Sequence, residues 1–95
     1  MSVYAIAQGR VDDQKKFNQY IELAVPTLEK HKVKTIALDE SPVLIEGNVD
    51  YPRTVILEFT DKAAFDKWYK SPEYQKAREH RVSAAFGTFI LVNGI

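Results

Sequence analysis

The chain has 95 residues, a length typical of one domain, and residues 1–95 are expected to fold as a single unit. Thirteen basic residues balance thirteen acidic ones, so no net charge attracts nucleic acid or an anionic membrane. The absence of cysteine excludes disulfides, a thiol nucleophile and thiolate metal sites. No pattern typical of a signal peptide or a membrane span is found at the N-terminus, and a cytoplasmic location is predicted.

The first elements are a short strand and a long helix. Residues 2–8 favour a β-strand that ends at Gly9 and is apolar on both faces. Asp12 or Asp13 can cap a helix that runs to about residue 32, because its apolar residues recur every three or four positions. Pro26 falls inside this helix and predicts a kink.

The middle of the chain predicts two further strands. Residues 34–39 form the first, and residues 41–50 read as a mixture of strand and turn because they contain proline, glycine and asparagine. Residues 53–59 are the strongest strand pattern in the chain, again with apolar side chains on both faces.

The last third predicts two short helices and a final strand. One helix follows a cap at Thr60 or Asp61, and Ser71-Pro72 then provides a second helix start. This second helix is expected to reach about residue 85, where Gly87 would break it before a last strand over residues 88–92.

This order of elements predicts an α+β fold, a ferredoxin-like split βαβ arrangement with a four-stranded antiparallel sheet and helices on one face. When helices cover one face of a sheet, the other face is normally polar and exposed to water, but three of these strands are apolar on both faces. A second copy packed sheet against sheet, as a closed homodimer, would cover that face. The alternative is a monomer whose bent sheet or long loop covers it.

Several segments together resemble the domain-of-unknown-function family 1330. They are Glu46-Gly47, the strand 53–59 ending in Glu-Phe, the Trp-Tyr-x-Ser-Pro-Glu-Tyr-Gln run at 68–75, Arg81 and the closing residues 91–94. The resemblance implies a dimeric α+β barrel, in which two ferredoxin-like sheets face each other. Relatives in the wider superfamily include cofactor-free monooxygenases and small decarboxylating or isomerising enzymes.

The sequence departs from the family at one point. Members often carry a glycine pair after the histidine that ends the first helix, whereas His31 is followed here by Lys-Val-Lys. A role carried over to His31 therefore does not follow from the resemblance.

Glu58 is the first candidate for chemistry because it lies inside the most apolar strand, on the face of Thr54 and Ile56. A carboxylate shielded from water there suits a general acid or base. The structural alternatives are an ion pair with an arginine such as Arg53, Arg78 or Arg81, or a place near the strand end where the side chain reaches water.

Two arginines on the predicted last helix are the next candidates. Arg78 and Arg81 share a face with apolar residues, so at least one guanidinium is carried toward the packed side. It could pair with Glu58 or Glu46, or bind a substrate carboxylate. Arg81 is the better site candidate because the family resemblance covers it.

The two histidines give no metal-binding spacing, and no metal site is predicted. His31 and His80 are both expected at the surface, although His80 could move protons if an interface brought it to a cavity. The four glycines form no phosphate-binding loop, and no cofactor is implied.

Aromatic residues gather around the break between the last two helices. Trp68, Tyr69 and Tyr74 either clamp these helices onto the sheet or form the wall of an apolar ligand pocket. Tyr4 could reach the interior of a barrel from the first strand. Ser71 is explained by capping alone.

Two functions remain in view. The first is a cofactor-free enzyme or ligand-binding protein, with Glu58 and Arg81 as polar anchors of a cavity for a small apolar or carboxylate-bearing molecule. The second is a structural or interaction domain whose sheet faces serve only homodimerisation.

Overall fold

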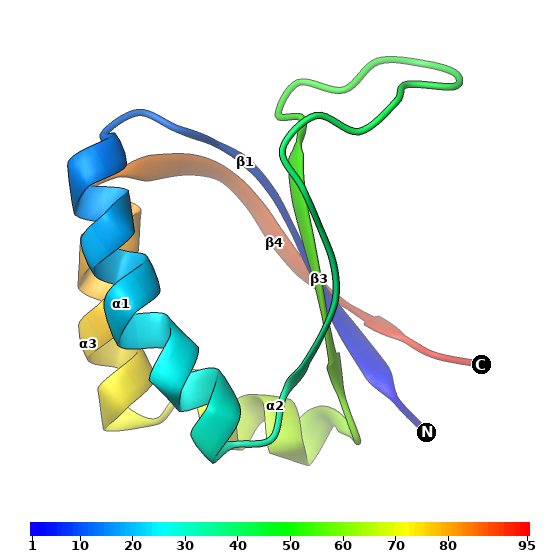
Figure 1. Ribbon diagram of the computed structural model, residues 1–95. Helices are drawn as coiled ribbons and strands as arrows, with labels where there is room; N and C mark the ends of the chain where they lie inside the picture. Colours follow the sequence, from blue (N-terminus) through cyan, green and yellow to red (C-terminus); the bar gives the residue numbers. More distant parts are fainter.

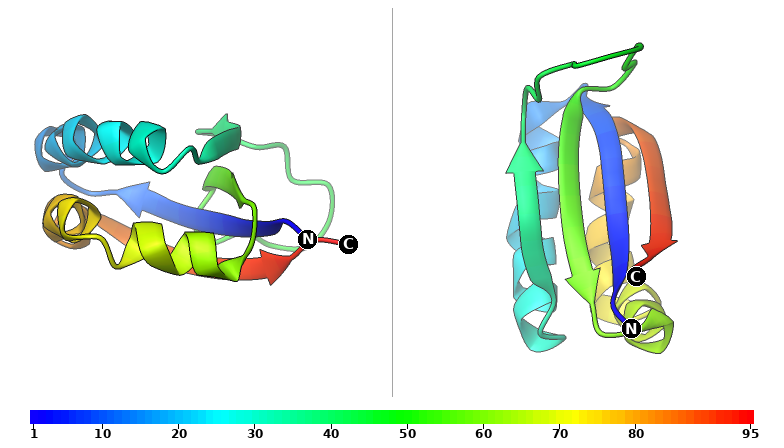
Figure 2. Two further views of the ribbon diagram at one scale, coloured as in Figure 1. Left: turned by 90° about the horizontal axis from the view of Figure 1, so that it is seen from below. Right: turned by 90° about the vertical axis from the view of Figure 1, so that its right-hand side faces the viewer.

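The structure, a computed structural model, describes residues 1–95 and has a four-stranded antiparallel sheet in the order β2-β3-β1-β4. All three helices cover one face of this sheet (Figures 1 and 2). This is the predicted ferredoxin-like α+β fold. The elements are β1 (Val3–Val11), α1 (Gln14–Lys30), β2 (Lys34–Asp39), β3 (Arg53–Phe59), α2 (Lys62–Tyr69), α3 (Pro72–Val82) and β4 (Ala85–Asn93).

Side-chain caps fix where the helices begin. The Asp13 carboxylate accepts from the Lys16 N–H at the start of α1, and the Asp61 carboxylate accepts from the N–H of Ala64 at the start of α2. The Ser71 hydroxyl does the same for α3. Each cap satisfies a backbone donor that the first helical turn leaves unpaired, so the capping predictions are confirmed. Helix α1 remains one continuous helix through Pro26.

Two predicted strand ends are wrong. Gly9 does not end β1, and Gly87 does not precede β4: both lie inside their strands and face each other in the β1–β4 ladder. A Cβ atom on Gly9 would lie 2.9 Å from the carbonyl oxygen of Phe86, and one on Gly87 would collide with the carbonyl oxygen of Gln8. Glycine here therefore allows a close approach of the two backbones. The bend of β1 and β4 toward α1 is visible in Figure 1.

The segment between β2 and β3 also differs from its prediction. Residues 40–52 contain no strand and extend from the end of the sheet as an irregular loop (Figure 1). Val43 and Ile45 in this loop are each 83% exposed. A proline, a glycine and an asparagine within this segment favour turns over a regular ladder.

The strands present two different faces. The helix-facing side buries Val3, Ala5, Leu57 and Phe59 in the core. The other face carries no helix, and on it Ile6 of β1 lies opposite both Ile56 of β3 and Ile90 of β4. We call these three side chains the isoleucine row. Ile90 is 54% exposed, so the chain leaves an apolar stripe across three strands uncovered.

Trp68 joins the helical layer to the sheet. Its side chain is fully buried, contacts the ring of Phe59 on β3 and lies 4.1 Å, centroid to centroid, from the ring of Tyr74. The indole N–H donates to the hydroxyl of Thr27 on α1 at 3.0 Å, which satisfies a donor that water cannot reach. One residue thus contacts α1, α3 and β3.

The end of α1 is held against the start of α3. His31 is nearly buried, and its Nε2 lies 3.2 Å from Oε1 of Glu73. Lys30 approaches the same carboxylate oxygen at 3.1 Å. The expectation that His31 lies at the surface is therefore wrong, because the C-terminus of α1 packs next to α3. None of the three helices has the combination of length and hydrophobicity that a membrane-spanning helix needs.

We predict that Gly87→Ala destabilises the protein by roughly 1–3 kcal/mol, because the added methyl group collides with the backbone of β1. Urea unfolding measures the change. Gly47→Ala is the control: it has open space around it and only a positive φ, so a loss of about 1 kcal/mol is expected. Equal stability of Gly87→Ala and the wild type would contradict the close approach.

A second prediction concerns acid stability. The N–H of Glu73 itself, at the start of α3, together with His31 and Lys30, lowers the pKa of Glu73 from 4.5 to about 2. The ionised group therefore stabilises the fold fully above pH 4.5, and this contribution is lost as the pH falls toward 2. We expect Glu73→Gln to show a smaller fall in melting temperature between pH 5 and 2.5 than the wild type. Parallel curves would argue against this role.

Candidate functional site

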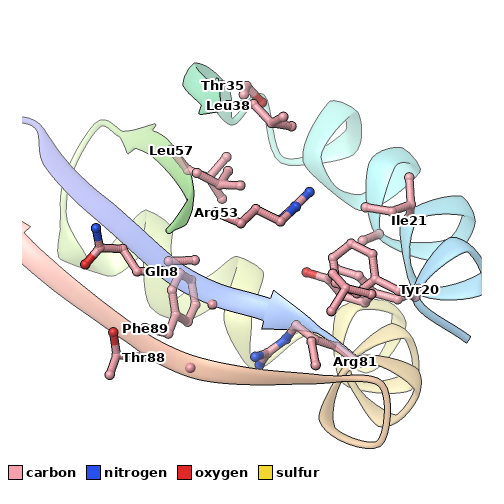
Figure 3. Close-up of a pocket in the computed structure, with 18 of the residues that line it drawn as sticks. Gln8, Tyr20, Ile21, Thr35, Leu38, Arg53, Leu57, Arg81, Thr88 and Phe89 are labelled. Atoms are coloured by element: carbon pink, nitrogen blue, oxygen red, sulfur yellow. The ribbon is translucent and has the colours of Figure 1, made fainter. Parts of the chain in front are cut away.

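A cavity of about 250 Å³ lies between the helix-facing side of the sheet and the helices α1 and α3 (Figure 3). Every strand and helix contributes to its lining, and α1 packs along α3 on this side of the sheet (Figure 1). Most of the lining is hydrophobic, contributed by side chains such as Phe17, Leu28, Val55 and Phe89. Such a cavity favours a small and largely apolar occupant.

Three of the polar residues that line this cavity come from three different elements; the other polar lining residues are Gln8, Arg10, Thr35, Tyr74 and Thr88. Arg53 comes from the start of β3, Tyr20 from the middle of α1 and Arg81 from the last turn of α3 (Figure 3). No aspartate, glutamate or histidine lines the cavity. The polar groups that reach into it are therefore mainly hydrogen-bond donors, and two of the three are positively charged.

Arg81 is held by aromatic rings. Its guanidinium carbon lies 5.9 Å from the ring centre of Tyr20 and 5.8 Å from that of Phe89. Contacts of this kind stabilise a cation modestly and leave its N–H groups free to donate. The Nε atom of Arg81 is buried and has no hydrogen-bond acceptor in the chain.

Arg53 occupies the opposite wall. Its side chain is 17% exposed, its guanidinium lies 4.9 Å from the ring centre of Phe17, and its Nε donates to Glu40 at 3.1 Å. The Glu40 side chain is itself mostly exposed, so this ion pair lies at the edge of the cavity. The two terminal nitrogens of Arg53 make no hydrogen bond to the protein.

Tyr20 and Tyr74 form a pair of hydroxyl groups in the cavity wall. Their oxygens are 3.1 Å apart, and either hydroxyl can be the donor. Burial, and then the neighbouring Tyr74, raise the pKa of Tyr20 above its ordinary value, while the positive charges of Arg81 and Arg53 oppose the rise. Tyr20 is therefore a neutral phenol at physiological pH, with both guanidinium groups nearby.

The structure brings together three of the residues predicted for the site. Arg81, Trp68 and Tyr74 all line the cavity. Tyr69 lies outside it and stacks on Phe65, with ring centres 5.6 Å apart. His80 lies on α3, is partly exposed and does not line the cavity either.

Glu58 and Tyr4 lie on the other face of the sheet. They are opposite each other in the β1–β3 ladder, and the Tyr4 hydroxyl donates to Oε2 of Glu58 at 3.2 Å. The negative charge of Glu58 raises the pKa of Tyr4. The sheet thus separates Glu58 from Arg81, and within one chain these two residues do not form the predicted pair of anchors.

The expected ion pairs of the α3 arginines are also absent. Neither Arg78 nor Arg81 forms an ion pair, with Glu58, Glu46 or any other carboxylate. Arg53, considered as a partner for Glu58, pairs with Glu40 instead. The reason is geometric: α3 lies on the helix side of the sheet, whereas Glu58 points to the uncovered side.

Two cavity residues, Arg53 and Tyr20, were missed as site candidates. A signal for Arg53 exists, because strand alternation places it on the same face as Val55 and Leu57. Tyr20 belongs to the apolar stripe of α1, where a tyrosine is read as core. No group of three or more side chains in the protein is arranged to hold a metal ion.

Several solved structures are similar to this chain. A protein of unknown function from Rhodopseudomonas palustris has a TM-score of 0.84 at 18% sequence identity, and the match covers 99% of this chain and 82% of that one. The cofactor-independent oxygenase SnoaB from Streptomyces nogalater has a TM-score of 0.67 at 14% identity, with 99% and 93% covered.

A dimeric protein of unknown function with a ferredoxin-like fold, from Bacteroides fragilis, has a TM-score of 0.63 at 13% identity, with 98% and 96% covered. At these identities the likeness establishes the fold alone. A search of curated proteins found no match. The sequence profile described as "Domain of unknown function (DUF1330)" matches residues 2–95. The chain therefore belongs to the DUF1330 family.

Proposed function

We propose that the protein is a homodimer in which each chain binds a small, largely apolar organic molecule in the cavity beneath α1. The observation that carries the ligand proposal is the cavity itself: about 250 Å³ of mostly apolar lining that the chain's own side chains leave unfilled. A space of about 150 Å³ already accommodates benzene, so a substituted ring would fit.

The polar groups of the cavity favour binding and orientation over acid–base chemistry. Arg53, Arg81, Tyr20 and Tyr74 supply donors, and no carboxylate or imidazole lines the cavity to accept a proton. The similarity to a cofactor-independent oxygenase supports a small-molecule role for this fold without supplying its reaction. Catalytic roles for Glu58 and His80 would require a second chain to bring them to a cavity.

The dimer proposal depends on the uncovered sheet face. The isoleucine row crosses three strands there, and polar pairs flank it: Tyr4 with Glu58 on one side, and Gln8 with Thr54 on the other. Packing a second copy onto this face would remove the apolar stripe from water. Similar structures include proteins described as dimeric, from Bacteroides fragilis and from a Jannaschia species.

The ligand proposal predicts the behaviour of a cavity-filling variant. We expect 4-methylbenzoate or 4-methylbenzamide to raise the melting temperature of the wild type, because a ligand that binds only the folded state stabilises it. Val55→Phe places a ring in the cavity floor and should remove the rise. Val82→Phe, which adds the same volume at an exposed site on α3, should keep it. No rise with either compound in the wild type would overturn the proposal.

The dimer proposal predicts a mass near twice 10.9 kDa by light scattering, persisting on dilution. Ile90→Glu should convert the protein to a folded monomer, because the charge would be buried in the isoleucine row of the interface. Val82→Glu is the matched control, since Val82 is 52% exposed and lies on the helical side. A wild type that is already monomeric, or an Ile90→Glu variant that stays dimeric, would refute packing through this face.

A further inference from the structure

The positive charge of Arg81 has no counter-charge within the chain, whereas Arg53 pairs with Glu40. Arg81 has a buried Nε without an acceptor and forms no ion pair, and its guanidinium rests only on aromatic rings. A buried charge is costly unless an opposite charge or several hydrogen bonds compensate it. Arg78 also lacks an acceptor for its Nε, and Arg81 differs from it by lining the cavity, where a bound molecule would supply the acceptor.

Arg53 adds a second unsatisfied donor group on the facing wall. Glu40 engages only its Nε, so the terminal nitrogens remain available toward the cavity (Figure 3). A guanidinium presents its donors in a planar fork that matches the two oxygens of a carboxylate. Two such forks directed into one apolar space are typical of a site for an organic anion.

The tyrosine pair supplies one more donor. When two hydroxyl groups are bonded to each other, one proton lies between them and the other is free to donate elsewhere. Tyr20 and Tyr74 have no other side-chain partner, so the free proton is available to an occupant of the cavity. The hydroxyl of Tyr20 lies between Arg53 and Arg81 in Figure 3.

The rest of the cavity lining determines the polarity of the part of the ligand that carries no charge. Apart from Thr35 and Arg53, the side chains along β2, β3 and α1 that line the cavity are aliphatic or aromatic, including Leu28, Leu38 and Leu57. They offer no hydrogen bonds to a sugar or a nucleotide base. An occupant that satisfies both parts of the cavity has one anionic group and an otherwise apolar frame.

We propose that the ligand is a small monocarboxylic acid with an aromatic or branched aliphatic body, bound as the anion. Its carboxylate lies between Arg81 and Arg53 and accepts a hydrogen bond from the Tyr20–Tyr74 pair, while its body fills the apolar part of the cavity. This inference rests on the ligand-binding role proposed above and specifies the chemical class of the ligand.

Binding of 4-methylbenzoate and 4-methylbenzamide, measured by calorimetry at pH 7 and low salt, tests the inference. The two compounds have nearly the same shape and differ in charge, so we expect the acid to bind at least about tenfold more tightly, as charge-assisted hydrogen bonds require. Equal affinities would overturn the carboxylate inference and leave the ligand cavity standing. Binding of neither compound would overturn both proposals.

Two variants on one helix assign the effect to Arg81. Arg81→Gln should reduce the affinity for the acid at least about tenfold and leave that for the amide nearly unchanged. Arg78→Gln is the matched control, because Arg78 also has a buried Nε without an acceptor but does not line the cavity. If both variants lower the affinity for the acid equally, Arg81 is not the residue that binds its carboxylate. If Arg81→Gln unfolds, Arg81→Lys keeps the charge without the planar fork and should still show a reduced acid preference.

Discussion

Two partly buried guanidinium groups that lack a full set of hydrogen-bond acceptors determine the chemistry of the space beneath α1. Arg81 enters that space from α3 and Arg53 from β3, yet the only carboxylate near either is Glu40 at the edge. The aromatic rings beside the guanidiniums hold them in position without neutralising them. The site is thus preorganised for an anion that the chain does not supply.

The rest of the helical layer keeps this arrangement rigid. Trp68 touches β3, α1 and α3, and its hydrogen bond to Thr27 ties α1 to this aromatic cluster. Tyr74 then sits against the indole and carries its hydroxyl to Tyr20. The predicted alternatives for these aromatics, clamp or pocket wall, are both true of Trp68 and Tyr74, because the same rings that hold the helices also line the cavity.

The fold was predictable because periodicity and capping residues are local signals. Asp13, Asp61 and Ser71 mark helix starts whatever the tertiary structure, and strand alternation correctly placed Glu58 on the face of Thr54 and Ile56. The site was less predictable because it depends on which face the helices cover. One sequence cannot say whether that face contains Glu58 or Arg53.

The glycine errors have a related cause. A glycine in a sequence normally indicates a turn or the end of a helix or strand, and on that basis Gly9 and Gly87 predict strand boundaries. In the structure their missing side chains allow two strands to approach, a long-range fact that appears only when β1 and β4 are paired. The same pairing brings residues from both ends of the chain to the cavity wall.

The irregularity in β2 restricts how sheets of this protein can join. The ladder between β2 and β3 shifts register between Thr35 and Ala37, so this edge strand is both short and bulged. Lys34 at one end and Asp39 at the other add charge to it. A bulged and charged edge is a poor template for adding a further strand, which in other proteins leads to fibres. The β2 edge of the sheet therefore disfavours open-ended polymerisation. The uncovered face of the sheet stays available for association that ends at a closed dimer.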